Sequence, residues 1–153
     1  MKRLIVVGVV ASLLLGAGHA AEVPDSGDDA QKLQGAWRGA ELEIKGDKLP
    51  PTSARSLRLR FTKDTFTIEQ GGKITVQGRY TIDAASKPKT IDLTITDTVQ
   101  AVNKGAVVLG IYALEKNQLK LCTTKANDQE RPKKLITKRG VPHSLFTFLK
   151  EKP

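Results

Sequence analysis

The sequence of 153 residues is poor in several residue types on which particular protein classes depend. It holds one Cys, which excludes a disulfide framework and a zinc site built from several cysteines. Aromatic residues make up only 5% of the chain, few for a surface that stacks nucleobases between basic side chains. Hydrophobic residues make up 39% and charged residues 27%, which excludes both disorder and a membrane bundle. The composition indicates one globular domain.

Residues that could support catalysis or bind a metal are also scarce. Of the two His, His19 lies in the apolar N-terminal stretch, which leaves Cys122 and His143 as the nucleophilic pair on offer. The chain contains no Gly-x-Ser-x-Gly sequence, phosphate-binding loop, paired His motif or calcium loop. Helix capping and solvation account for the acidic residues, including Asp28, Asp29 and Asp92. We therefore expect no enzymatic activity, no metal and no cofactor.

Residues 1–20 have the pattern of a secretory signal peptide. A short basic start precedes an apolar run over residues 4–15, and small residues stand before Ala20. The run is shorter than the roughly 20 residues that a membrane-spanning helix needs. We predict cleavage after Ala20 and a periplasmic or secreted protein, with membrane contact only during export. An uncleaved N-terminal anchor is the alternative.

The net charge of +9 is unevenly distributed along the chain. Residues 22–47 hold more acids than bases, whereas the rest of the chain after residue 47 is strongly basic. We divide the chain into the signal peptide, a flexible lead over residues 21–28, and a domain over residues 29–150. A basic surface on an exported domain can attract anionic partners, but well-solvated scattered bases are the other interpretation.

Most of the domain alternates apolar and polar residues with a period of two, which is typical of half-buried strands. The clearest case is a hairpin around Lys63-Asp64. A two-residue loop there places Phe61 opposite Phe66 and Arg58 opposite Glu69, so that both faces of the hairpin match. Charged side chains then point outward and apolar side chains inward.

Two further connections also predict a register. Around Gly71-Gly72-Lys73, a three-residue loop with a bulge at a glycine places Ile68 opposite Val76, and Ile74 then faces inward with Val76. A hairpin at Lys116-Asn117 sets Leu114 opposite Leu119 and Tyr112 opposite Leu121, which turns Cys122 to the opposite face. Two weaker strands are expected over residues 135–138 and 144–149.

About eight strands in sequential order with mostly short connections predict an all-β fold: an eight-stranded antiparallel up-and-down barrel. A helical turn over residues 28–34 precedes it. The interior of such a barrel is either filled by side chains or holds one small ligand. Residues expected to face this interior, and to contact a small apolar ligand if one binds, are Leu57, Leu59, Phe61, Phe66, Ile68, Val76, Tyr80, Leu93, Tyr112 and Leu121.

A second hypothesis makes the protein a non-catalytic interaction module with a basic outer face. Its partner would be an acidic protein or an envelope polymer. Nucleic acid is not expected as a partner, because no aromatic residue lies between Tyr112 and Phe146 to interleave with the bases. The residues of this basic outer face are Arg58, Arg60, Lys120, Lys133, Lys134 and Lys138.

An ordered series of motifs from about Asp29 to Leu149 resembles the planctomycetal lipocalin-like domain of unknown function. The motifs include Gly35-Ala36-Trp37, Gly110-Ile111-Tyr112, Leu119-Lys120-Leu121-Cys122 and Arg131-Pro132. The resemblance implies a lipocalin-like barrel in which the Trp of the Gly-x-Trp sequence closes one end, and it implies no known activity. It also implies structural roles for Gly35, Trp37, Gly110, Cys122, Arg131 and Pro132.

Overall fold

The structure, a computed structural model, describes residues 26–153. The predicted signal peptide lies outside the described residues, and residues 26–28 of the predicted lead belong to the first helix. No helix within this part of the chain is long and apolar enough to cross a bilayer. The elements are α1 (Ser26–Leu33), β1 (Gly35–Ile44), β2 (Asp47–Lys48), α2 (Pro51–Arg55), β3 (Leu57–Thr62), β4 (Thr65–Gln70), β5 (Lys73–Asp83), β6 (Lys89–Thr98), η1 (Ala101–Asn103), β7 (Val107–Glu115), β8 (Gln118–Thr123) and β9 (Ser144–Lys150).

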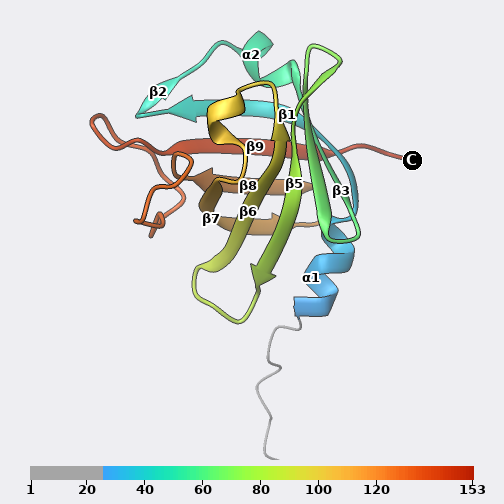
Figure 1. Ribbon diagram of the computed structural model, residues 1–153. Helices are drawn as coiled ribbons and strands as arrows, with labels where there is room; N and C mark the ends of the chain where they lie inside the picture. The colour runs from blue at the N-terminus through green and yellow to red at the C-terminus, as the bar shows by residue number, and fades with distance from the viewer. Residues whose placement is uncertain (1–25) are drawn as a thin grey trace, which may run out of the picture.

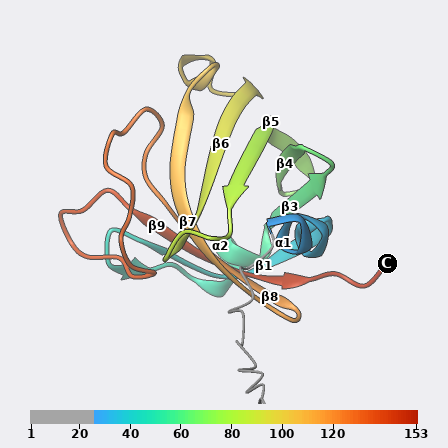
Figure 2. The same cartoon turned by 90° about the horizontal axis from the view of Figure 1, so that it is seen from below.

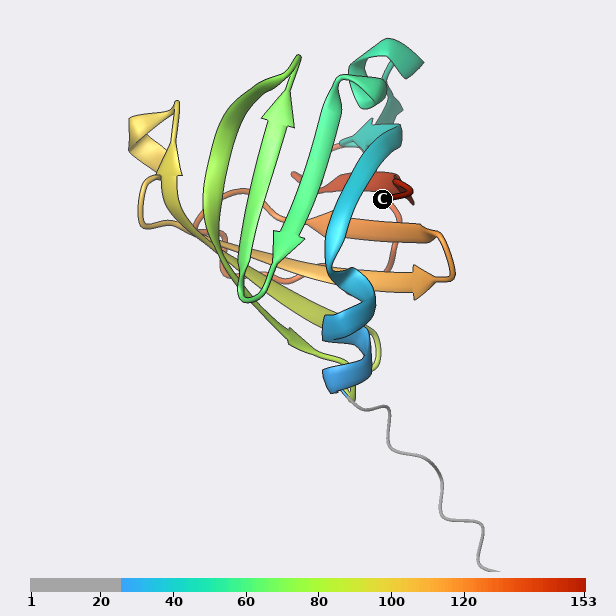
Figure 3. The same cartoon turned by 90° about the vertical axis from the view of Figure 1, so that its right-hand side faces the viewer.

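The strands form a closed antiparallel barrel, as predicted (Figure 1). Strand β1 pairs with β3, each strand from β3 to β8 pairs with the one that follows it, and β9 pairs back with β1 to close the ring. In Figure 3 the green strands β3 to β5 run across the orange and red strands β7 to β9. The short strand β2 is not part of the ring and pairs antiparallel with the last two residues of β1, Glu43 and Ile44.

The predicted register of the β3–β4 hairpin is confirmed. Phe61 pairs with Phe66 and Arg58 pairs with Glu69 across the two-residue loop. The Arg58 guanidinium also lies 3.7 Å from the Glu69 carboxylate on the outer face. The hairpin at Lys116-Asn117 likewise has its predicted pairs.

The β4–β5 connection differs from the predicted three-residue loop. Gln70 pairs with Lys73, so the loop consists of Gly71-Gly72 alone. Both glycines have positive φ angles, 58° and 81°, as a tight turn matching the twist of the flanking strands requires.

Because the loop has two residues and not three, one residue of β5, Thr75, has no partner on β4. Ile68 pairs with Val76 as predicted, but Glu69 pairs with Ile74, so that the ladder skips Thr75 in a bulge. The prediction that Ile74 faces the interior is therefore wrong, and its side chain is 49% exposed.

Two other expectations about secondary structure are corrected. Residues 135–138 do not form a strand and belong to the long connection between β8 and β9. The short helices α2 and η1 were not predicted, because five or fewer residues show no helical period. Ser144–Lys150 forms the last strand, in agreement with the prediction.

One end of the barrel is closed by α1 and by two side chains next to it. Trp37 is fully buried and donates from Nε1 to the carbonyl of Leu33 at 2.8 Å. The Lys150 ammonium lies 4.6 Å from the centre of the Trp37 ring and donates to the carbonyls of Lys32 and Gln34. Burial of this ammonium lowers the pKa of Lys150. We call this the closed end, and the opposite end, beneath α2, the open end.

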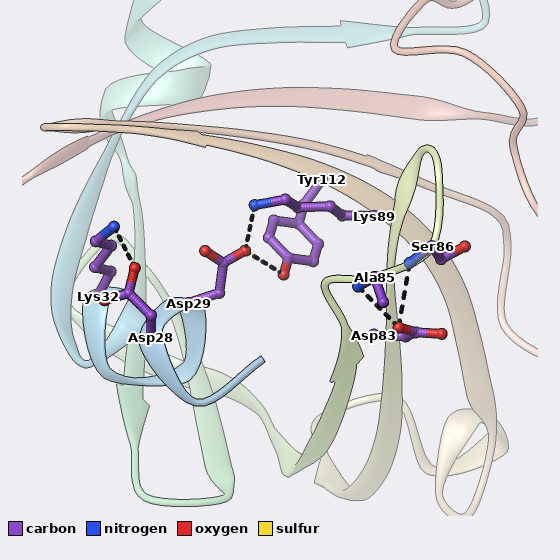
Figure 4. Close-up of polar contacts among 8 residues, drawn as sticks. All are labelled: Asp28, Asp29, Lys32, Asp83, Ala85, Ser86, Lys89 and Tyr112. Atoms are coloured by element: carbon purple, nitrogen blue, oxygen red, sulfur yellow. Dashed lines mark hydrogen bonds and ion pairs between the residues drawn. The ribbon is translucent and has the colours of Figure 1, made fainter. Parts of the chain in front are cut away.

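A buried carboxylate on α1 fastens the helix to the barrel (Figure 4). Asp29 accepts hydrogen bonds from the Tyr112 hydroxyl on β7 and the Lys89 ammonium on β6, both at 2.7 Å. Its neighbour Asp28 forms an exposed pair with Lys32 within the helix. The prediction that capping and solvation account for both carboxylates is therefore wrong for Asp29, because its side chain points into the barrel end.

We expect Asp29→Asn to lower the free energy of unfolding by about 1–3 kcal/mol at pH 7, because its charged hydrogen bonds are lost. Burial alone would raise the pKa of Asp29, but hydrogen bonds from Lys89 and Tyr112 outweigh burial and leave the pKa lowered. Such a contribution is present above the unfolded carboxyl pKa and disappears as the pH falls through the folded value. In urea unfolding, the difference from wild type should shrink below about pH 4.

Asp28→Asn is the matched control for this measurement. Its partner Lys32 lies at 2.6 Å, but both side chains are largely exposed, so the expected loss is below about 1 kcal/mol. Equal losses for the two variants, or a loss for Asp29→Asn that does not change with pH, would show that Asp29 does not fasten α1 through its charge.

Candidate functional site

Seven of the ten predicted interior residues form the packed lower core of the barrel. They lie on strands β3 to β8 and each is at most 6% exposed. The Phe61 and Tyr80 rings meet edge to face at 4.7 Å, and Tyr80 donates its hydroxyl to the Lys63 carbonyl. The seven are Leu59, Phe61, Phe66, Tyr80, Leu93, Tyr112 and Leu121.

The other three predicted interior residues lie nearer the open end and are only partly buried. Leu57 starts β3, and Ile68 and Val76 form a cross-strand pair on β4 and β5. Val108 on β7 and Phe146 on β9, which were not predicted, are also partly buried and pack against the same core. The structure thus separates the predicted interior set into a packed lower layer and a half-buried upper layer.

The predicted basic outer face is divided between distant parts of the fold. Arg58 and Arg60 lie on β3, where Arg58 is already paired with Glu69 and Glu151. Lys120 lies on β8 and does not line the same hollow as the remaining three bases. Lys133, Lys134 and Lys138 lie together on the connection between β8 and β9.

The connection between β8 and β9, residues 124–143, crosses the outside of the barrel as a strap. Figure 2 shows it on the side of the molecule away from α1. Arg131 fixes the strap to the sheet by donating to the carbonyls of Gly110 at 2.8 Å and Ile91 at 3.2 Å. The same guanidinium lies 2.6 Å from the Asp92 carboxylate. Asp92, predicted to be merely solvated, is therefore an anchor for the strap.

The far half of the strap is held by the β1–β2 turn. The Thr137 hydroxyl bonds to the Glu43 carboxylate and accepts from the backbone nitrogen of Gly46 at 3.0 Å. The backbone nitrogen of Lys45 donates to the carbonyl of His143 at 3.0 Å. With Arg131 at one half and these bonds at the other, the strap is anchored along its length.

A hollow of about 1000 Å³ lies between the strap and the outer face of the barrel. Thr90 on β6 and Ile111 on β7 contribute to its lining, as do the residues of the β5–β6 connection. We call this hollow the strap groove. Its ionisable lining residues are Lys87, Asp128, Glu130, Arg131, Lys133, Lys134, Lys138 and His143.

The residues of the motif resemblance have structural surroundings. Gly35 has a positive φ of 106°, and a Cβ at Gly110 would lie 3.1 Å from the carbonyl oxygen of Cys122. Pro132 is buried beside Arg131 in the strap. Cys122 faces outward from the barrel, as predicted, but the strap covers it completely.

Sequence reasoning missed Lys87, Ile111, Ile136 and the approach of His143 to the strap groove. A period of two places Ile111 on the outer face but does not show what covers it. Two features of the sequence indicate such a cover: an apolar residue at an outward position of a strand, and the long polar connection that follows β8. Among residues 26–153, no group of three or more His, Cys, Asp or Glu is placed to hold a metal ion.

We expect the Cys122 thiol to react very slowly with a disulfide reagent in the folded protein. The thiol is fully buried, and burial raises its pKa to about 11 from an ordinary value near 9. At pH 8 this reduces the thiolate fraction about a hundredfold, and the strap reduces access further. Reaction with 5,5′-dithiobis(2-nitrobenzoate) should be slow in buffer and fast in guanidinium. The variant Lys120→Cys, on an exposed site of the same strand, should add one fast-reacting thiol; equally fast reaction of folded wild type would contradict the expected burial.

Comparisons of the chain with protein-family models, with curated proteins and with solved structures give no significant match.

Proposed function

We propose that the protein is a non-catalytic binding protein whose barrel holds one small, largely apolar molecule at the open end. The observation that carries this proposal is the layering of the interior. Seven of the predicted interior residues are packed, whereas Leu57, Ile68 and Val76 toward the open end are only partly buried, as are Ile82 and Leu114 elsewhere on the core. A ligand that covers these side chains removes apolar surface from water, which favours binding.

The position of the site follows from the two ends of the barrel. Helix α1, Trp37 and Lys150 fill the closed end, so a ligand enters from the other side. The half-buried residues Leu57, Ile68 and Val76 lie there on three neighbouring strands, and Phe146 lies on β9. The ligand then rests on the packed layer beneath these residues.

We test this site with the neutral fluorophore N-phenyl-1-naphthylamine, because a neutral probe does not respond to the basic exterior. Val76→Trp fills the upper layer and should weaken binding at least about tenfold, since the added ring occupies the ligand's volume. Leu149→Trp adds the same ring at an exposed position on β9 and should leave the dissociation constant unchanged.

Absence of binding to wild type, or equal affinities for the two Trp variants, would overturn the barrel site. Circular dichroism of each variant checks that the added ring has not unfolded the barrel. If Val76→Trp does not fold, the amide chemical shifts of wild type titrated with the same probe decide the question. Shifts centred on Leu57, Ile68 and Val76 support the site, and shifts elsewhere refute it.

We also propose that the chain belongs to the planctomycetal lipocalin-like family and is exported. The motif residues Trp37 and Gly110 occupy places in a closed barrel that suit the resemblance. N-terminal sequencing of the protein from its host envelope or medium tests the export proposal. A chain beginning at Ala21 is the expected result, and a chain retaining residues 1–20 would contradict cleavage.

A further inference from the structure

We propose that the strap groove is a second binding site, which takes an organic anion with an apolar body, such as a long-chain carboxylate. This site lies outside the barrel and is independent of the open-end site. Three features carry the proposal: the charge on its walls, the apolar side chains in its lining, and the anchoring of the strap.

The walls of the strap groove carry lysines from two separate segments. Lys87 comes from the β5–β6 connection, and Lys133, Lys134 and Lys138 come from the strap. None of these four forms an ion pair with any residue in the described part of the chain, whereas Arg131 is occupied by Asp92 and two carbonyls. Two carboxylates, Asp128 and Glu130, also line the groove but do not balance the four ammonium groups. An anion therefore meets unpaired positive charge here.

Apolar side chains line the same hollow. Ile136 on the strap is 46% exposed, and Pro88, Val141 and Pro142 add further accessible apolar surface. Ile111 on β7 and Pro132 on the strap are buried beneath them and support the groove from below. Exposed ion pairs alone are weak, so affinity for a ligand depends on burying an apolar body along this surface. The combination favours an amphipathic anion over a small inorganic one.

The size and rigidity of the groove favour a small molecule over a polymer. A volume of about 1000 Å³ stands at the upper end of the range for small-molecule sites. Arg131, Thr137 and the bond between Lys45 and His143 hold the strap at separate points, so the hollow is already formed in the free protein. A preformed site loses little conformational entropy on binding. The lysines Lys133, Lys134 and Lys138 thus serve the strap groove rather than a continuous basic face that includes Arg58.

Isothermal titration with dodecanoate, kept below its critical micelle concentration, tests the proposal. The triple variant Lys133→Gln/Lys134→Gln/Lys138→Gln should bind about tenfold more weakly, because each removed charge near an anion is worth a few-fold. The triple variant Lys73→Gln/Lys104→Gln/Lys116→Gln removes the same charge from exposed positions outside the groove and should bind as wild type does. At the strap groove, as located by the amide shifts described below, dodecanol, which lacks the charge, and acetate, which lacks the chain, should both bind at least tenfold more weakly than dodecanoate.

Amide chemical shifts of wild type locate the bound dodecanoate. Shifts at Ile111 and along residues 131–138 support the strap groove. Shifts confined to Leu57, Ile68 and Val76 would overturn it and assign dodecanoate to the barrel instead. Equal affinities of the two triple variants would overturn the role of the groove lysines. Binding of poly-glutamate without binding of dodecanoate would also overturn the proposal and would favour an acidic polymer as the partner.

Discussion

Strand β1 hydrogen-bonds on one side to β3 and β2 and on the other to β9, so the barrel has no free edge along this strand. Exposed strand edges can pair with other chains and cause aggregation, and the pairing of β1 with β9 leaves no such edge between these two strands. The same pairing brings Lys150 opposite Trp37, which seals the closed end against α1. On the same strand, Gly39 lets α2 pack closely, because a Cβ there would lie 2.0 Å from the carbonyl oxygen of Ala54. Strand β1 therefore positions both the closed end and α2.

The hairpin registers could be predicted from the sequence because they are decided by neighbouring residues. A slip of one position would turn Arg58 inward and Phe61 outward, so matching faces leave one register for each loop length. The Gly71-Gly72 connection shows where this reasoning stops. Pairing of Ile68 with Val76 was correct, but a short turn plus a bulge satisfies it as well as a longer loop. The two solutions differ in whether Ile74 faces water.

Contacts between distant segments could not be predicted in the same way. Periodicity places Ile111, Asp92 and Cys122 on the outside of the barrel, and all three do lie there. It does not show that residues 124–143 return over them, because that segment has no regular period. Asp29 is a similar case: its helix was expected, but its partners Lys89 and Tyr112 lie far along the chain. The candidate interior was thus accessible to sequence reasoning, while the strap groove was not.

Because the strap contributes no strand to the barrel, its exposed side chains are free of the constraints that fix the interior. Positions 133, 134 and 138 can change in charge or size without altering a cross-strand pair, provided that Arg131 and Thr137 keep the segment in place. Surface substitutions of this kind usually change stability by less than about 0.5 kcal/mol. The outer surface of such a barrel can therefore diversify, by evolution or by design, while the fold and its inner layer stay the same.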